Sequence, residues 1–287
     1  MLRIGTWVML AMITQFFVNY FDTLMVGYLE GPVATASQAA SGLGMPLFWA
    51  IGGFFAAVGV GTQAIVARRY AEGDLPRAGQ ALYNSLIIAI VLGLGGALLG
   101  YFITPYGVDF LATASREQEE LATTYTQIRM IGVPGMVVTF SYKAFFDGLG
   151  RTWVHLYAAL AMNFANIGLN YLLIFGFEPL GIPRLELAGA GVASVIATYM
   201  GLIIIIWVSH RHDYRAKYHI YHASHFDVGI MGRIVKLMLP SGTATVILMV
   251  GFMLFMMFVG QLDAARGDGT NTFTAATKAL MDTAALC

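Results

Sequence analysis

The feature that most constrains this chain is a series of long apolar segments that contain almost no charged residues. A helix needs about 20 mainly apolar residues to cross the hydrocarbon core of a bilayer. Every backbone polar group inside hydrocarbon must be satisfied within its own segment, so runs of this length are expected to be helices. Seven such runs occur: Ile4–Leu29, Gly31–Ala67, Ala78–Val108, Leu121–Phe146, Thr152–Phe177, Leu187–Val208 and Leu237–Leu262.

The composition agrees with this reading. Hydrophobic residues make up 58% of the 287 residues, charged residues only 11%, and the formal net charge is zero. An ordinary soluble domain has about 25% charged residues. The absence of a basic excess leaves nucleic-acid binding without electrostatic support. We predict an all-α polytopic membrane helix bundle, with six helices in an N-terminal lobe, a seventh helix, and the start of an eighth over Thr274–Cys287.

One polar connection, His210–Gly232, is longer than the others and contains five of the six histidines. It predicts three parts, namely residues 1–208 as the N-terminal lobe, 209–232 as a solvated cytoplasmic linker, and 233–287 as the beginning of a second lobe. Within it, His219, His222 and His225 recur at every third residue. Such a pattern is compatible with metal binding, but a solvated loop is the favoured interpretation, so we expect no metal site.

The distribution of Lys and Arg predicts the orientation in the membrane, because cytoplasmic loops are enriched in these residues. If the first run starts inside, the inner ends collect eleven of them and the outer ends four. We therefore expect a cytoplasmic N-terminus. The inner residues are Arg3, Arg68, Arg69, Arg77, Lys143, Arg151, Arg211, Arg215, Lys217, Arg233 and Lys236, and the outer ones are Arg116, Arg129, Arg184 and Arg266.

Asp22 is the principal candidate for a functional residue. It lies roughly 10 Å from the outer end of the first run, at 1.5 Å per residue. A carboxylate at that depth costs roughly 2–3 kcal/mol or more, so it usually faces a bundle interior or a wet cavity. A proton carrier or cation ligand is the favoured role, and a structural carboxylate paired with a buried base is the alternative. Arg129 is such a base, although we interpret it as reaching the membrane surface.

The fifth run contains Asn163, Asn166 and Asn170, whose spacings of three and four place them on one face of a helix. Asn166 and Asn170 lie at the same depth as Asp22, and amides can coordinate Na⁺ or bond a protonated acid. Hydrogen bonding between helices is the alternative role. Thr198 in the sixth run is a candidate to complete the pocket. Asn19 and Asn163 are further candidates to line it.

Ser-His-Asp, metalloprotease and phosphate-loop patterns are all absent from the sequence. We therefore expect no enzymatic activity, no cofactor and no ATP site, so that any transport takes its energy from an ion gradient, of H⁺ or Na⁺, or from a partner. Glycine-rich stretches lie inside the runs, where they allow close helix packing.

An ordered set of short motifs resembles the multidrug and toxic compound extrusion (MATE) transporters. The set extends through the whole chain, and its strength lies in the order, since no single motif is specific. The motifs are Asp22–Gly27, Gly61–Asp74, Gly132–Pro134, Asp147–Thr152, Asn166–Asn170, Ile174–Gly176, Gly189–Ala193, Ala197–Thr198 and Leu239–Pro240.

The resemblance implies twelve helices in two six-helix lobes, and export of small organic, often cationic, compounds across the inner membrane in exchange for H⁺ or Na⁺. It implies that Asp22 is the ion-coupling residue, with Asn166, Asn170 and Thr198 around it. It also implies that a chain ending at Cys287 is a fragment. One branch of the family has an aspartate where Asn170 stands, so the coupling ion stays open.

Two other functions remain open at this point. A related flippase for lipid-linked saccharides would have a large cationic cavity for a pyrophosphate, whereas the runs contain few Arg or Lys. If the chain is a membrane scaffold or a channel subunit, the equal depth of Asp22 and the asparagines is accidental. Ion-dependent transport of a dye distinguishes the three.

Overall fold

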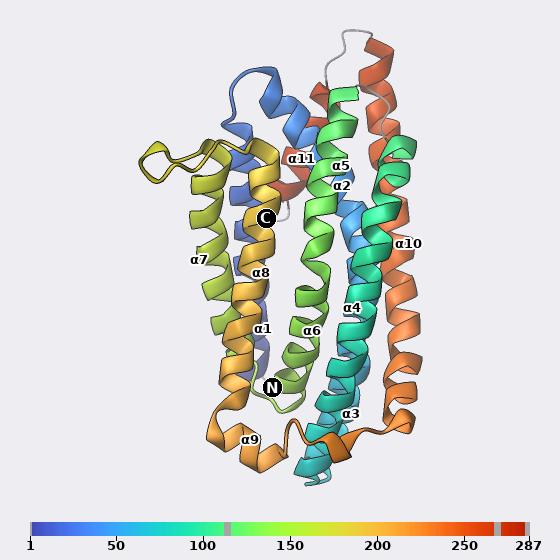
Figure 1. Cartoon of the computed structure of the whole chain (residues 1–287). Helices are drawn as coiled ribbons and strands as arrows, with labels where there is room; N and C mark the ends of the chain where they lie inside the picture. Colours follow the sequence, from blue (N-terminus) through green and yellow to red (C-terminus); the bar gives the residue numbers. More distant parts are fainter. Residues whose placement is uncertain (1, 112–115, 267–270, 285–287) are drawn as a thin grey trace.

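The structure is a computed structural model that describes residues 2–111, 116–266 and 271–284. These residues form helices and no strand, which confirms the all-α prediction, and the long helices run side by side (Figure 1). The elements are α1 Leu2–Gly27, α2 Pro32–Ala56, α3 Val58–Ala71, α4 Leu75–Leu111, α5 Arg116–Ile131, α6 Val133–Gly148, α7 Trp153–Phe175, α8 Glu186–His210, α9 His212–Tyr218, α10 Val228–Arg266 and α11 Thr272–Ala284, with the short 3₁₀ helices η1 Glu178–Leu180 and η2 Ala223–His225.

Six helical stretches of the described chain are long and apolar enough to cross a membrane. They correspond to six of the seven predicted runs, with α2 and α3 forming a single stretch that turns at Ala57. The stretches are Met9–Gly27, Pro32–Ala71, Leu75–Leu111, Trp153–Phe175, Glu186–His210 and Val228–Arg266.

The predicted run Leu121–Phe146 differs, because it forms two helices of 16 residues each, α5 and α6. They meet at Gly132 and lie end to end in the bundle (Figure 1). Pro134, at the start of α6, has no N–H and its ring clashes with the carbonyl of the preceding turn, which interrupts the helix. Neither helix alone is as long as the spans above.

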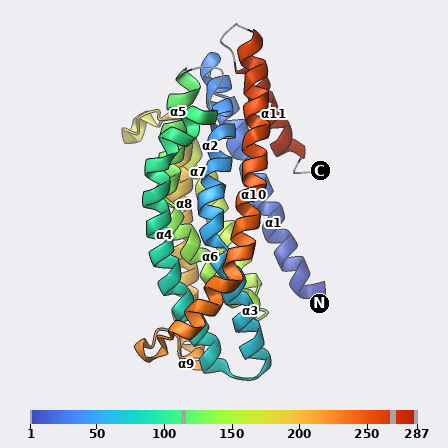
Figure 2. The same ribbon diagram turned by 90° about the vertical axis from the view of Figure 1, so that its right-hand side faces the viewer.

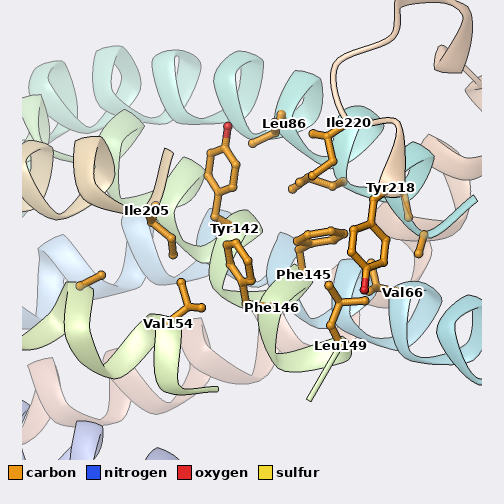
Figure 3. Close-up of a cluster of buried hydrophobic side chains, with 14 residues drawn as sticks. Val66, Leu86, Tyr142, Phe145, Phe146, Leu149, Val154, Ile205, Tyr218 and Ile220 are labelled. Carbon is orange, nitrogen blue, oxygen red and sulfur yellow. The ribbon is translucent and has the colours of Figure 1, made fainter. Parts of the chain in front are cut away.

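Many alanines and several glycines lie in the interior beside aliphatic side chains and a few aromatic ones, while other large apolar side chains of α4, α7, α8 and α10 face outwards. This distribution is the one expected of helices in lipid, where close packing rather than apolarity selects the interior residues. Gly189 illustrates it, since an added Cβ would lie 2.5 Å from the Leu173 carbonyl oxygen of α7. Figure 3 shows one buried cluster, in which Phe145 and Phe146 of α6 meet Tyr218 and Ile220.

The region after α8 differs from the predicted solvated linker. Tyr218 at the end of α9 and Ile220 after it are 3% and 1% exposed, so this part of the linker belongs to the core. Among the described residues, no group of three or more His, Cys, Asp or Glu side chains is placed to hold a metal ion.

The seventh predicted helix begins earlier than the run Leu237–Leu262. α10 starts at Val228 because the Asp227 carboxylate accepts bonds from the backbone N–H groups of Gly229, at 2.7 Å, and Ile230, at 3.1 Å. α10 then packs along α2 and α3 (Figure 2). α11 occupies the predicted start of an eighth helix, residues 285–287 of which lie outside the described part. The division at residues 208 and 232 stays a prediction.

Candidate functional site

Asp22 and Asn170, which lie far apart in sequence, are in direct contact. α1 packs against α7, and the Nδ2 group of Asn170 donates a hydrogen bond to Oδ1 of Asp22. Asn170 is fully buried and Asp22 is half-buried. The depth match predicted from the two helices is therefore realised as a bond between a carboxylate and an amide inside the bundle.

The polar contact continues from α7 to α8. Asn170 Nδ2 also lies 3.4 Å from Oδ1 of Asn166, and Asn166 Nδ2 donates to the hydroxyl of Ser194 at 3.2 Å. The four side chains Asp22, Asn170, Asn166 and Ser194 form a chain of hydrogen bonds across three helices, which we call the Asp22 network.

Thr198 does not join the Asp22 network through its hydroxyl. Its Oγ1 donates to the backbone carbonyl of Ser194 at 2.8 Å, within α8. The serine one turn earlier occupies the place that the sequence analysis gave to the threonine. Ser194 was missed because a serine among Gly and Ala residues looks like a small packing residue, although it lies on the same helix face as Thr198.

Asp22 also lines a cavity of about 410 Å³. The wall is formed mainly by apolar residues of α1, α2, α8 and α10, including Trp49 and Phe252. Its polar lining includes Asn19, Thr23, Lys278 and Asp282 as well as Asp22. A mostly apolar hollow with a few convergent polar groups is the usual form of a site for a small organic molecule.

Lys278 and Asp282 of α11 are cavity residues that the sequence analysis did not identify. They form an ion pair, and Lys278 Nζ also donates to Oγ1 of Thr23 at 3.2 Å. The Thr23 hydroxyl in turn bonds the Asp282 carboxylate. Their spacing of four residues on a short terminal helix was the available signal. The cluster joins α11 to α1, one residue from Asp22.

Arg129 contacts aromatic rings of α2 and α5. Its guanidinium lies 4.5 Å from the ring centre of Phe48 and 6.0 Å from that of Tyr125, and the side chain is partly exposed, so its reach to the membrane surface stays a prediction. Phe48 is 4% exposed and Tyr125 6%. Arg129 and Lys278 supply the positive charges that act on the Asp22 carboxylate, and Asp282 supplies a negative one.

Asn163 and Asn19 have different surroundings. Asn163 is 5% exposed, yet neither of its side-chain polar atoms has a hydrogen-bond partner among the described residues, and it is not among the cavity-lining residues. Asn19 lines the cavity, and its Oδ1 lies 3.5 Å from Nε2 of Gln15. The structure thus places Asn19 beside Asp22 in the cavity and leaves Asn163 apart from it.

A comparison with models of protein families shows to which family the chain belongs. Residues 8–172, more than half of the chain, match the family model named MatE. The chain belongs to the MatE family. Members of this family are transporters and not enzymes, in agreement with the expected lack of enzymatic activity. The family match, together with the six membrane-length helices, confirms the prediction of an integral membrane protein.

Curated relatives support the same family. The chain is 26% identical over 265 residues to the multidrug resistance protein PmpM of Pseudomonas aeruginosa, covering 92% of this chain and 54% of that protein. It is 29% identical over 225 residues to a probable multidrug resistance protein NorM of Halalkalibacterium halodurans, covering 76% and 47%. The chain therefore spans about half the length of these relatives.

Solved structures show the same fold. A multidrug resistance MATE family transporter of the MOP superfamily, in an inward-facing conformation, superposes with a TM-score of 0.76 at 23% identity, over 91% of this chain and 56% of that one. A MOP superfamily transporter from Pyrococcus furiosus superposes with a TM-score of 0.77 at 22% identity, over 99% and 63%.

Proposed function

We propose that this chain is part of an antiporter that exports organic, cationic compounds across the cytoplasmic membrane in exchange for H⁺ or Na⁺. The observation that carries the proposal is the double position of Asp22. One side of its carboxylate is bonded to Asn170 in the Asp22 network, and the other lines a largely apolar cavity. A group so placed can sense both an ion and a substrate.

The charges of the cavity lining support exchange of cations. With Asp22 ionised, the lining residues Asp22, Asp282 and Lys278 together carry one net negative charge, which the positive charge of Arg129 outside the lining opposes. Neutralising Asp22 makes this sum one unit more positive, so an organic cation is attracted to the lining more strongly before Asp22 accepts its proton or Na⁺. Binding of the ion and binding of the substrate compete for one carboxylate, and competition of this kind is the basis of antiport.

Alternating access then requires that the ion stabilise one conformation more than the other. Neutralising Asp22 weakens the bond from Asn170, because hydrogen bonds to a charged acceptor are stronger than bonds to a neutral one. α1 is then less firmly held to α7, so that it can repack and release the substrate. We propose an N-terminus on the cytoplasmic side and no use of ATP.

The flippase alternative has less support. A cavity for a lipid-linked pyrophosphate would need several cations, whereas two carboxylates and one ammonium group line this cavity. The PmpM and NorM relatives are named as multidrug resistance proteins, which favours export of organic compounds.

The test is efflux of a fluorescent organic cation from proteoliposomes that contain the intact transporter, driven by an imposed H⁺ or Na⁺ gradient. Asp22→Asn is expected to abolish coupled efflux. Asp109→Asn, which removes an exposed carboxylate at the end of α4, is the matched control and should transport normally. Efflux by Asp22→Asn at the wild-type rate would refute the assignment.

A further inference from the structure

The linker between α8 and α10 contains a second hollow, far from Asp22 along the bundle. It is an open pocket of about 680 Å³, lined by His210, Arg215, His219 and His222 among others. α9, which supplies Arg215, lies at the opposite end of the bundle from α11 (Figure 1). We call it the linker pocket.

The linker pocket has a fixed shape because the chain around it is anchored in the bundle. Tyr218 and Ile220 are buried against α4 and α6 (Figure 3). Gly79 permits this approach, since a Cβ there would lie 1.9 Å from the Tyr218 carbonyl oxygen. The hydroxyl of Tyr221 lies 2.5 Å from that of Ser209 and 2.9 Å from that of Tyr142.

The backbone conformation directs the histidines outwards. His219 and Tyr221 have positive φ angles of 49° and 71°, which are uncommon for residues other than glycine. These two residues flank Ile220, which enters the core, while His219 and His222 stay exposed with ring centres 6.0 Å apart. The strained turn therefore keeps two imidazoles beside each other at the pocket.

The pocket carries the fixed positive charge of Arg215. Among the side chains that the structure describes, its lining contains no carboxylate, and Arg215 takes part in none of the ion pairs. Nearby cations are differently placed, with Arg211 over the Trp207 ring and Lys217 over the Tyr218 ring. A guanidinium that lines one pocket with several imidazoles is suited to an anionic oxygen group such as phosphate.

An apolar strip on α8 leads to the same pocket. Met200, Ile203 and Trp207 are 42%, 65% and 64% exposed, and with His210 they follow the spacing of one helix face. His210 lies about 4.5 Å beyond Trp207 along the helix axis. Tryptophan is enriched at the level of lipid headgroups. A lipid whose acyl chains cover the strip would therefore have its phosphate at the level of the pocket.

We propose that the linker pocket binds the phosphate of an anionic phospholipid of the cytoplasmic leaflet, with Arg215, His219 and His222 as donors and the strip on α8 as the acyl-chain surface. Only the choice of leaflet depends on the proposed orientation. Because the linker joins α8 to α10, the lipid would fix the connection between the two parts of the transporter.

The test measures the thermal stability of the purified intact transporter in detergent, since a ligand of the folded state raises the melting temperature. Short-chain phosphatidylglycerol is expected to raise it. Phosphatidylcholine of the same chain length is expected to raise it much less, because its choline cation balances the phosphate charge and is repelled by Arg215. Arg215→Ala should require about tenfold more phosphatidylglycerol for an equal rise, since Arg215 gives a charge-assisted bond. Lys217→Ala, which removes a cation from the same helix but not from the pocket, should behave as wild type.

A second arm uses inorganic phosphate and the double variant His219→Gln and His222→Gln. Phosphate alone is expected to give no rise in melting temperature. The double variant should need more phosphatidylglycerol for an equal rise, as Arg215→Ala does. A full rise in melting temperature with phosphate alone would mean that the pocket binds a soluble anion, and would overturn the assignment to a lipid. An equal loss of the response to phosphatidylglycerol in Arg215→Ala and Lys217→Ala, or no loss in either, would overturn the assignment of the linker pocket as a lipid site. The efflux assay of Asp22→Asn is independent of these outcomes, so the two proposals can fail separately.

Discussion

Two carboxylates, Asp22 on α1 and Asp263 near the end of α10, are both held within helices but have opposite surroundings. Asp263 is 1% exposed and accepts three bonds, from the backbone N–H groups of Phe273 and Thr274 at 2.8 Å and from the Thr274 hydroxyl at 2.7 Å. Asp22 accepts one hydrogen bond among the described residues and borders a cavity.

The difference separates a structural carboxylate from one available for chemistry. The bonds to Asp263 come from the start of α11, so its charge serves as a helix cap between α10 and α11. Asp22 keeps acceptor positions that no donor in the described part of the chain fills, and these are the positions a proton or Na⁺ needs. Open acceptor positions beside a cavity, rather than burial alone, are the reason we propose Asp22 and not Asp263 as the coupling residue.

The largest expected effect is a loss of transport without a loss of stability. Asp22→Asn removes the charge but keeps an oxygen for Asn170, so we expect coupled efflux to vanish while the melting temperature changes by only a few degrees. Thermal unfolding and dye efflux on the same preparation check this. If Asp22→Asn unfolds as it loses activity, Asp22 is a structural carboxylate like Asp263.

Asp263→Asn is expected to do the reverse. Hydrogen bonds to a charged group contribute about 1.5–3 kcal/mol each, so its loss should lower the free energy of unfolding by about 2 kcal/mol or more. The ion dependence of efflux should stay unchanged in the protein that remains folded. A changed dependence on H⁺ or Na⁺ would assign Asp263 a role in coupling.

Two asparagines of α7 provide the next comparison. Asn170→Leu removes the bond to Asp22 and should slow efflux about tenfold or more, as the loss of a charge-assisted bond predicts. Asn163→Leu removes two buried polar atoms without partners and should raise the melting temperature while efflux is retained. Slower efflux in Asn163→Leu would mean that Asn163, about one helical turn before Asn166, belongs to the Asp22 network.

The smallest effects are expected on α8. Ser194→Ala removes the partner of Asn166 and should cost about 1 kcal/mol of stability, the usual net contribution of a neutral bond, with a severalfold slower efflux. Thr198→Val loses only a bond to its own helix and should be close to wild type. The melting temperature and efflux rate of both variants check the order, and a larger effect of Thr198→Val would reverse it.

Much of the fold was predictable because hydrocarbon imposes a length and a composition on every span. The runs of α1, α4, α7, α8 and α10 could be read directly, and so could the common face of Asn163, Asn166 and Asn170. The break at Gly132 was not predicted, although Pro134 gave a local reason for it. The early start of α10 depended on a cap at Asp227 outside the apolar run.

The contacts between helices could not be predicted in the same way. Ser194 rather than Thr198 meets Asn166, and Arg129 stacks on Phe48, because the rotation of each helix about its axis is set by packing with all its neighbours. The cluster of Lys278, Asp282 and Thr23 joins residues more than 250 positions apart.

The sequence by itself determined that this chain crosses a membrane as helices, that one acid lies deep in the first of them, and that three amides share a face of another. It did so because bilayer thickness and the helical repeat act locally along the chain. Only the tertiary structure decided that Asn170 bonds Asp22, that a cavity opens beside it, and that the linker histidines surround a pocket. Those features depend on how the helices pack, which no local stretch of sequence specifies.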